Sequence, residues 1–197
     1  SNGEVYCIGY FLGTVDFDAD TATYFKTAVG NIDIFMLKLS ANGVLDWVKT
    51  IGSAQDDLGL YIQLQNDQSI IISGVFSENI NFGDTFNPII LSSQGKKDIF
   101  VAKLNENGIT SWAKSFGGSE IDYNLALSLD QENILLSGAF YNTVDFDFGP
   151  ATHQISSNAG SITGELYVLK INQTINMLQS SDTLTICEAD SILLNSG

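Results

Sequence analysis

Apolar residues along this chain recur with the spacing of β-strands, and helical periodicity is missing. Residues 35–39 and 100–104 alternate between apolar and mixed positions, so that successive side chains face opposite sides of a sheet. Each run leads to an Asn-Gly pair, Asn42-Gly43 or Asn107-Gly108, and then to an extended run with a tryptophan. Because both residues of such a pair tolerate positive φ, the pattern predicts a β-hairpin at each place.

The strand pattern is repeated nearly three times along the chain with a fixed spacing. Gly9, Gly74 and Gly138 lie inside the same apolar phrase, and they are 65 and 64 residues apart. Trp47 and Trp112 are also 65 residues apart, and we expect both to be largely buried. This period indicates a unit that buries its apolar face against copies of itself. A glycine inside each strand predicts a bulge or close backbone packing against a neighbouring unit.

The number of apolar runs predicts about four strands per repeat, with a further hairpin or long loop between the second and third. Four antiparallel strands per unit are typical of propeller blades. We therefore predict an all-β fold of antiparallel β-propeller blades, about three repeats of ~65 residues in an incomplete propeller or arc. The expected blades cover residues 4–53, 54–118 and 119–179. The first lacks its first strand, so we expect an open edge through which this arc associates.

Charge narrows the classes of partner. The chain has 23 acidic residues against eight lysines, no arginine and a net charge of -15. Arginine is the preferred side chain for bidentate contacts to phosphate and guanine, so we expect no nucleic-acid partner. An anionic membrane surface is disfavoured for the same reason. No apolar run approaches the ~20 residues that span a bilayer, and we expect no membrane insertion.

The sharpest candidate for chemistry is the acidic run Asp16, Asp18 and Asp20. Alternate aspartates suit calcium, which takes six to eight oxygen ligands, although the glycine and closing glutamate of an EF-hand loop are absent. In a strand every second side chain faces the same way, so the run also fits a solvated face with Phe17 turned inward. We favour the solvated face, and predict neither a metal site nor a cofactor.

Catalysis finds little support in the sequence. His153 is the only histidine, and it stands in a loop-like context without a serine or cysteine motif beside it. No nucleophile elbow or phosphate loop is present. Asp57 and Asp122 each precede a strand, and we interpret them as turn caps rather than as paired acids. We therefore predict no catalytic and no cofactor-binding residue.

Three phrases resemble the bacterial SBBP family, which is named for seven-bladed β-propellers. They are Val-Asp-Phe-Asp at 144–147, Asp-Ile-Phe-Val-Ala-Lys-Leu at 98–104 and Trp-Ala-Lys-Ser-Phe-Gly-Gly at 112–118. The resemblance covers about residues 4–175. It implies propeller blades in a secreted or cell-surface protein of Bacteroidetes, exported by type IX secretion.

The composition changes after the third repeat. Residues 181–197 resemble the opening of immunoglobulin-like modules in large surface proteins of Bacteroidetes. We expect 180–197 to form a linker and the first strand of such a module, which implies a partner for Cys187 further along. Cys7 replaces an apolar residue of the other repeats, so we expect a buried free thiol, with a Cys7–Cys187 disulfide as the alternative.

These features together predict a non-catalytic structural or binding module of a large secreted or cell-surface bacterial protein. The expected partners are a protein or a glycan, besides the neighbouring blades, and the expected role is adhesion or interaction. The alternative is a propeller-fold hydrolase or lyase whose site lies outside this fragment.

Overall fold

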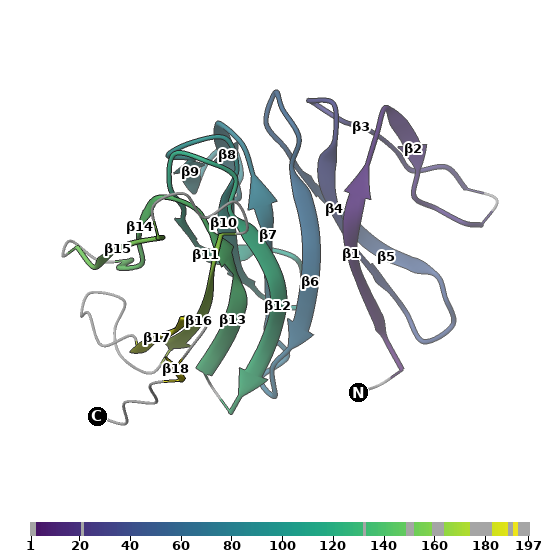
Figure 1. The fold of residues 1–197 in the computed structure, drawn as a ribbon. Helices are drawn as coiled ribbons and strands as arrows, with labels where there is room; N and C mark the ends of the chain where they lie inside the picture. Colours follow the sequence, from purple (N-terminus) through teal and green to yellow (C-terminus); the bar gives the residue numbers. More distant parts are fainter. Residues whose placement is uncertain are drawn as a thin grey trace.

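The computed structural model describes residues 3–20, 22–131, 133–148, 152–158, 164–173, 183–188 and 191–192. All regular structure in these residues is β-strand, and the strands pair antiparallel in three larger sheets and three two-stranded hairpins. Figure 1 shows the three larger sheets side by side, with β6 (Leu58–Leu64) next to β1 (Val5–Phe11) and β12 (Tyr123–Asp130) next to β6. The prediction of an all-β fold of antiparallel propeller-type blades is confirmed. The described residues contain no helix that could cross a membrane.

The second blade shows the complete repeat. Its four strands follow one another across the sheet in the order of the chain: β6 (Leu58–Leu64), β7 (Ile70–Phe76), β10 (Asp98–Leu104) and β11 (Thr110–Phe116). The segment between β7 and β10 forms a separate hairpin of β8 (Asn79–Asn81) and β9 (Ile90–Ser92). The sequence predicted this insertion as a hairpin or a long loop.

The first and third blades are variants of this plan. The first contains β1 (Val5–Phe11), β4 (Asp33–Leu39) and β5 (Leu45–Ile51), with a hairpin of β2 (Thr14–Asp16) and β3 (Phe25–Thr27). The third contains β12 (Tyr123–Asp130), β13 (Asn133–Phe140) and β16 (Glu165–Asn172), with a hairpin of β14 (Thr143–Asp145) and β15 (Gln154–Ser156).

The third sheet continues into the segment after the last repeat. β17 (Thr183–Glu188) pairs with β16, and β18 (Ser191–Ile192) pairs with β17. β17 thus takes the position that β11 has in the second blade, although by sequence spacing residues 175–178 are the counterpart of β11. Those residues lie outside the described part of the chain, and the immunoglobulin-like module stays a prediction.

The core lies between the sheets, because each blade packs its faces against its neighbours. Along β7, Ile70 and Ile72 pack toward the first blade, while Ile71 packs toward the third. Every residue of β7 is buried. Such a strand reads as a continuous apolar run, because neither of its faces meets water.

The repeated glycines make room for aromatic rings within one sheet. Gly74 pairs with Phe100 of β10, and a Cβ at Gly74 would collide with that ring and with the backbone carbonyl of Leu58 on β6. Gly9 and Gly138 lie under Phe35 and Tyr167 in the same way. The predicted close approach is therefore present within one sheet rather than against a neighbouring unit. The predicted bulge is also present, in the partner strands beside Gly74 and Gly138.

The Asn-Gly turns and the tryptophans recur in equivalent places. Gly43 and Gly108 have φ angles of 83° and 75°, which glycine adopts without strain. Trp47 pairs with Lys38, and Trp112 pairs with Lys103, in the two outer hairpins. Both tryptophans are half-buried rather than largely buried, because each lies on the outermost strand of its sheet.

Candidate functional site

Each junction between blades is tied by one buried aspartate. The Asp57 carboxylate accepts a hydrogen bond from the Ser53 amide, which follows β5 of the first blade, and one of 3.0 Å from Ser77 after β7. Sixty-five residues later, Asp122 accepts hydrogen bonds from the amides of Gly118 and Tyr141, at 2.7 and 3.0 Å. Both carboxylates cap the ends of strands from two blades, in agreement with the prediction of turn caps.

A second buried aspartate lies close to each cap. Asp33 and Asp98 begin β4 and β10, and each is only 1% exposed. Gly52 and Gly117 provide the room, since a Cβ at either position would collide with the adjacent carboxyl group. Each junction therefore holds two carboxyl groups in a space that glycine keeps open.

Burial dominates the electrostatics of these carboxyl groups. It raises the pKa of Asp98 from 3.8 to about 6, against the opposing effect of the Gln94 amide, and the charge of Asp122 adds to the increase. Burial also raises the pKa of Asp122 to about 6, although two backbone amides favour its ionised form. For Asp57 the pKa is raised for the same reason. The second junction thus carries two carboxyl groups that resist ionisation below about pH 6.

A polar cleft of about 420 Å³ opens between the second and third blades. Asp98 forms its buried side, and the β14–β15 hairpin contributes the half-buried Asp145 and Asp147. The aromatic Phe116 and a set of hydroxyl, amide and glycine residues complete the lining: Gln94, Ser115, Gly117, Gly118, Ser119, Thr143 and Gln154. With three carboxyl groups and no lysine among the described lining residues, the cleft suits a ligand that donates hydrogen bonds or carries positive charge.

The same pair of side-chain to backbone hydrogen bonds closes each of the three small hairpins. Asp16 Oδ1 accepts hydrogen bonds from the amides of Asp18 and Tyr24, at 3.1 and 2.7 Å. Asp145 Oδ1 and Asn81 Oδ1 accept the equivalent pairs of bonds in the other two hairpins. Since an asparagine performs this role in the second blade, the negative charge of Asp16 is not needed for the turn.

The rest of the predicted acidic run is part of the same exposed hairpin. Asp18 Oδ1 accepts the Asp20 amide at 3.0 Å. Asp18 is half-buried and Asp20 is exposed. Phe17 packs against Phe11 and Phe35, turned inward as the solvated-face interpretation expects. The described residues contain no group of three acidic, histidine or cysteine side chains placed to hold a metal ion.

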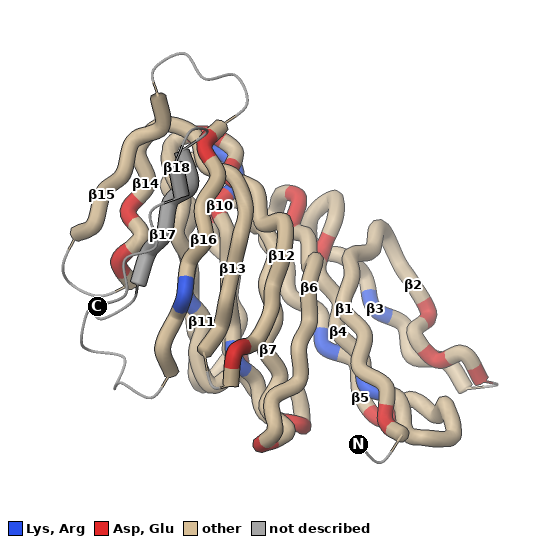
Figure 2. Tube along the Cα trace, turned by 60° about the horizontal axis from the view of Figure 1, so that its bottom comes forward, with Lys and Arg blue, Asp and Glu red and all other residues tan. Residues whose placement is uncertain are grey.

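Several lysines form hydrogen bonds or ion pairs within a blade or between neighbouring blades. Figure 2 shows acidic residues mainly at turns and hairpins, with several lysines along the strands. Lys49 Nζ on β5 donates hydrogen bonds to the Phe82 carbonyl, the Gly108 carbonyl and Thr110 Oγ1 of the second blade, at 2.9, 3.2 and 2.9 Å. Its burial lowers its pKa. These contacts leave the exposed hairpins acidic.

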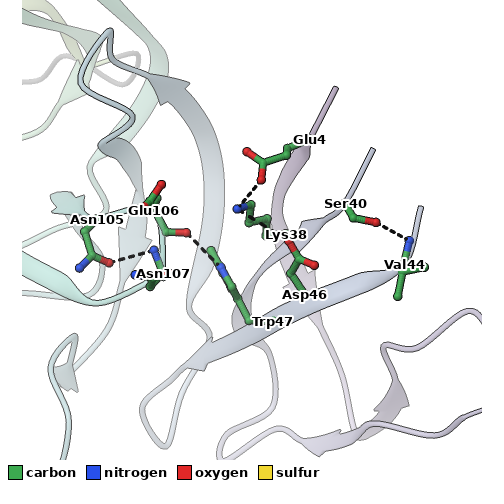
Figure 3. A network of polar contacts seen from close by, with 9 residues as sticks. All are labelled: Glu4, Lys38, Ser40, Val44, Asp46, Trp47, Asn105, Glu106 and Asn107. Atoms are coloured by element: carbon green, nitrogen blue, oxygen red, sulfur yellow. Dashed lines mark hydrogen bonds and ion pairs between the residues drawn. The ribbon is translucent and has the colours of Figure 1, made fainter. Parts of the chain in front are cut away.

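A second network fastens the outer edge of the first junction (Figure 3). Lys38 Nζ lies 2.7 Å from Glu4 and 3.7 Å from Asp46, and the bond to Glu4 helps to raise the pKa of Lys38. Trp47 Nε1 donates a 3.2 Å hydrogen bond to the carbonyl of Glu106, in the β10–β11 turn of the next blade. Trp47 therefore both packs and hydrogen-bonds across the junction between the first and second blades.

The side chains of His153 and Cys7 do not line the cleft. His153 is exposed, and its backbone amide rather than its ring contacts Asp145. Cys7 is a half-buried free thiol, and the side chain of Cys187 lies outside the described part. Sequence reasoning missed Asp33 and Asp98. The signal was available, because both begin an Asp-Ile-Phe phrase at the repeat spacing and both face a repeated glycine.

Comparison with models of protein families gives no match. Two curated proteins show distant similarity. An uncharacterised WD repeat-containing protein of Acanthamoeba polyphaga mimivirus is 24% identical over 172 residues, which are 84% of this chain and 12% of that protein. The regulatory protein FlaEY of Caulobacter vibrioides is 26% identical over 144 residues, 70% of this chain and 14% of that protein. The chain thus spans about an eighth of the length of these relatives.

The fold and the similarity to these two proteins together define the general class of protein to which the chain is similar. The chain is a β-rich repeat protein with propeller-type blades, and its distant relatives are named as repeat and regulatory proteins. This class is consistent with a protein-interaction module.

Proposed function

We propose that this chain is a protein-interaction module of a larger polypeptide, which uses the hairpin end of its blades to bind a partner. One observation carries the proposal: the repeats share their framework but differ at the exposed hairpin positions. Phe25, Ile90 and Gln154 occupy equivalent places on β3, β9 and β15, and all three are exposed. Repeat scaffolds form binding surfaces by varying exposed positions on a constant frame.

The chemistry of the hairpins supports binding of a protein. Phe86 at the tip of the β8–β9 hairpin is 92% exposed, and Phe25 and Ile90 are each 62% exposed. Aromatic anchors carry a large part of the binding energy at interfaces, and the exposed Phe86 and Phe25 suit that role. The acidic groups around them favour a partner with basic residues.

We place the parent protein outside the cell, as an SBBP-type surface protein of Bacteroidetes with an adhesive role and type IX export. The support is the resemblance of three repeated phrases to that family. In this setting the chain is non-catalytic and needs neither a metal nor a cofactor, and a glycan is a second class of partner. Protease treatment of intact producing cells tests the location: the chain is expected to be cleaved, and full protection contradicts an external location.

Site-specific photo-crosslinking of the full polypeptide tests the binding surface. A photoreactive phenylalanine analogue replaces Phe86 at the hairpin end, or the exposed Asn66 in the β6–β7 turn at the opposite end of the same sheet. The proposal predicts defined crosslinked products from position 86 and none from position 66. Equal products from both positions, or none from position 86, contradict it.

A further inference from the structure

The cleft at the second junction contains a buried acceptor that the protein leaves unused. Asp98 Oδ2 accepts the Gln94 amide at 2.8 Å, whereas Asp98 Oδ1 makes no full hydrogen bond among the described residues, with the Gly95 amide as the nearby donor that favours its ionised form. At the first junction, both oxygens of the equivalent Asp33 are bonded, to the amides of Val29 and Gly30 at 2.7 and 3.1 Å. A buried carboxylate oxygen without a partner is costly, so a donor that enters the cleft would relieve this cost.

The first junction also shows that the cleft's polar lining is not required by the fold. The positions of Asp145 and Asp147 are taken by Asn81 and Gly83 in the second blade, according to the pairing of the two hairpins. Three further lining positions change from polar to apolar between the second and first junctions: Gln154 to Ile90, Ser119 to Ala54 and Gln94 to Val29. The same framework thus forms without Asp145 and Asp147, which are present at the second junction and absent from the equivalent places at the first.

The arrangement favours an organic cation over a metal ion. The carboxyl groups do not converge closely enough to form a metal site among the described residues. A cleft of about 420 Å³ has room for an extended group, and its acceptors include carboxylate, amide and hydroxyl oxygens. A guanidinium group presents five donors in a planar fork, which satisfies several separate acceptors at once. The chain itself contains no arginine that could fill the cleft.

We propose that the cleft between the second and third blades binds an arginine side chain of a partner protein, with Asp98 and Asp145 as its acidic walls. This inference rests on the proposed interaction function and assigns it a specific recognition site. A cation bound in the cleft would favour the ionised carboxylate and so lower the raised pKa of Asp98.

Titration with a blocked Gly-Arg-Gly peptide, followed by amide chemical shifts, tests the site. For a single side chain we expect a dissociation constant on the order of 1 mM. Changes should centre on Gln94 and Ser119. Asp145→Asn copies Asn81 and keeps the amide bonds of the turn, and it should weaken binding about tenfold, equivalent to about 1.4 kcal/mol. Asp98→Asn should have a similar effect. Asp18→Asn makes the same change in net charge on the first blade's hairpin and should leave binding unchanged.

The same titration with other ligands decides between sources of positive charge. A peptide with citrulline, the neutral isostere of arginine, should not bind. Equal binding of the citrulline peptide, an equal loss with Asp18→Asn, or no shifts at about 10 mM arginine peptide overturns the proposal. Tighter binding of spermidine or calcium that also depends on Asp145 would mean that the cleft binds a free cation. That result would overturn the proposal of a partner's arginine side chain. A failed titration leaves the crosslinking from position 86 unaffected, so the two proposals fail separately.

Discussion

Removing the charge of Asp98 should make the protein more stable at neutral pH. The folded pKa of about 6 exceeds the ordinary value of 3.8, so the native state binds this proton more tightly than the unfolded state does. The free energy of unfolding therefore falls as the pH rises from about 4 to about 6. The difference of about 2.2 pKa units, at 1.36 kcal/mol each, gives a total of about 3 kcal/mol. Between pH 4.5 and 7.5, about 2 kcal/mol of it should be lost.

Asp98→Asn is the matched perturbation, because asparagine stays neutral and its oxygen still accepts the Gln94 amide. Its NH2 group takes the place of the oxygen that makes no full hydrogen bond, near the Gly95 amide, and the comparison between two pH values cancels any contact that does not titrate. Urea unfolding at pH 4.5 and 7.5 should show the variant gaining about 2 kcal/mol relative to the wild type at the higher pH.

Asp33→Asn is the control at the equivalent position. Both oxygens of Asp33 accept amide hydrogen bonds, so an NH2 group there faces an N–H donor and the variant should lose stability. A stability difference between Asp98→Asn and the wild type that does not change with pH would refute the reasoning, since burial of an ionisable group must appear as pH dependence.

Four further predictions address the frame and the acidic run. Gly74→Ala should cost about 1–3 kcal/mol in a thermal melt, because its Cβ meets the Leu58 carbonyl; Gly9→Ala meets only the Phe35 ring and should cost less. Lys49→Met removes three hydrogen bonds to the second blade, although the Phe82 carbonyl keeps the bond from Thr110 Oγ1, and should cost about 1–3 kcal/mol. Lys96→Met, which removes an exposed pair with Glu120, should cost under about 1 kcal/mol. Trp47→Phe should lose about 0.5–1.5 kcal/mol with the bond to Glu106, and no change in the melt would contradict that role. Calorimetry should show no tight calcium binding, and a saturable heat that disappears with Asp18→Ala would contradict the solvated-face interpretation.

The sequence alone determined the fold class, because its main signals are local or strictly periodic. Alternation along residues 35–39 and the Asn-Gly pairs follow from backbone geometry and need no distant contact. The spacing of Gly9, Gly74 and Gly138 then identified equivalent strands, which the structure places in three successive sheets. The inward direction of Phe17 was predictable for the same reason, since alternate residues of a strand face opposite sides.

Tertiary structure decided which residues meet, because the important contacts join segments far apart in the chain. The half-burial of Trp47 follows from its place on an outermost strand, and its bond to Glu106 spans 59 positions. β17 pairs with β16 because the edge of the third sheet is open at β16. Sequence patterns do not specify which segment pairs with an open edge. The cleft depends on a hairpin of the third blade lying over the ends of two strands of the second. Periodicity makes the repeats look alike, and only packing shows that Asp98 keeps an oxygen unbonded where Asp33 does not.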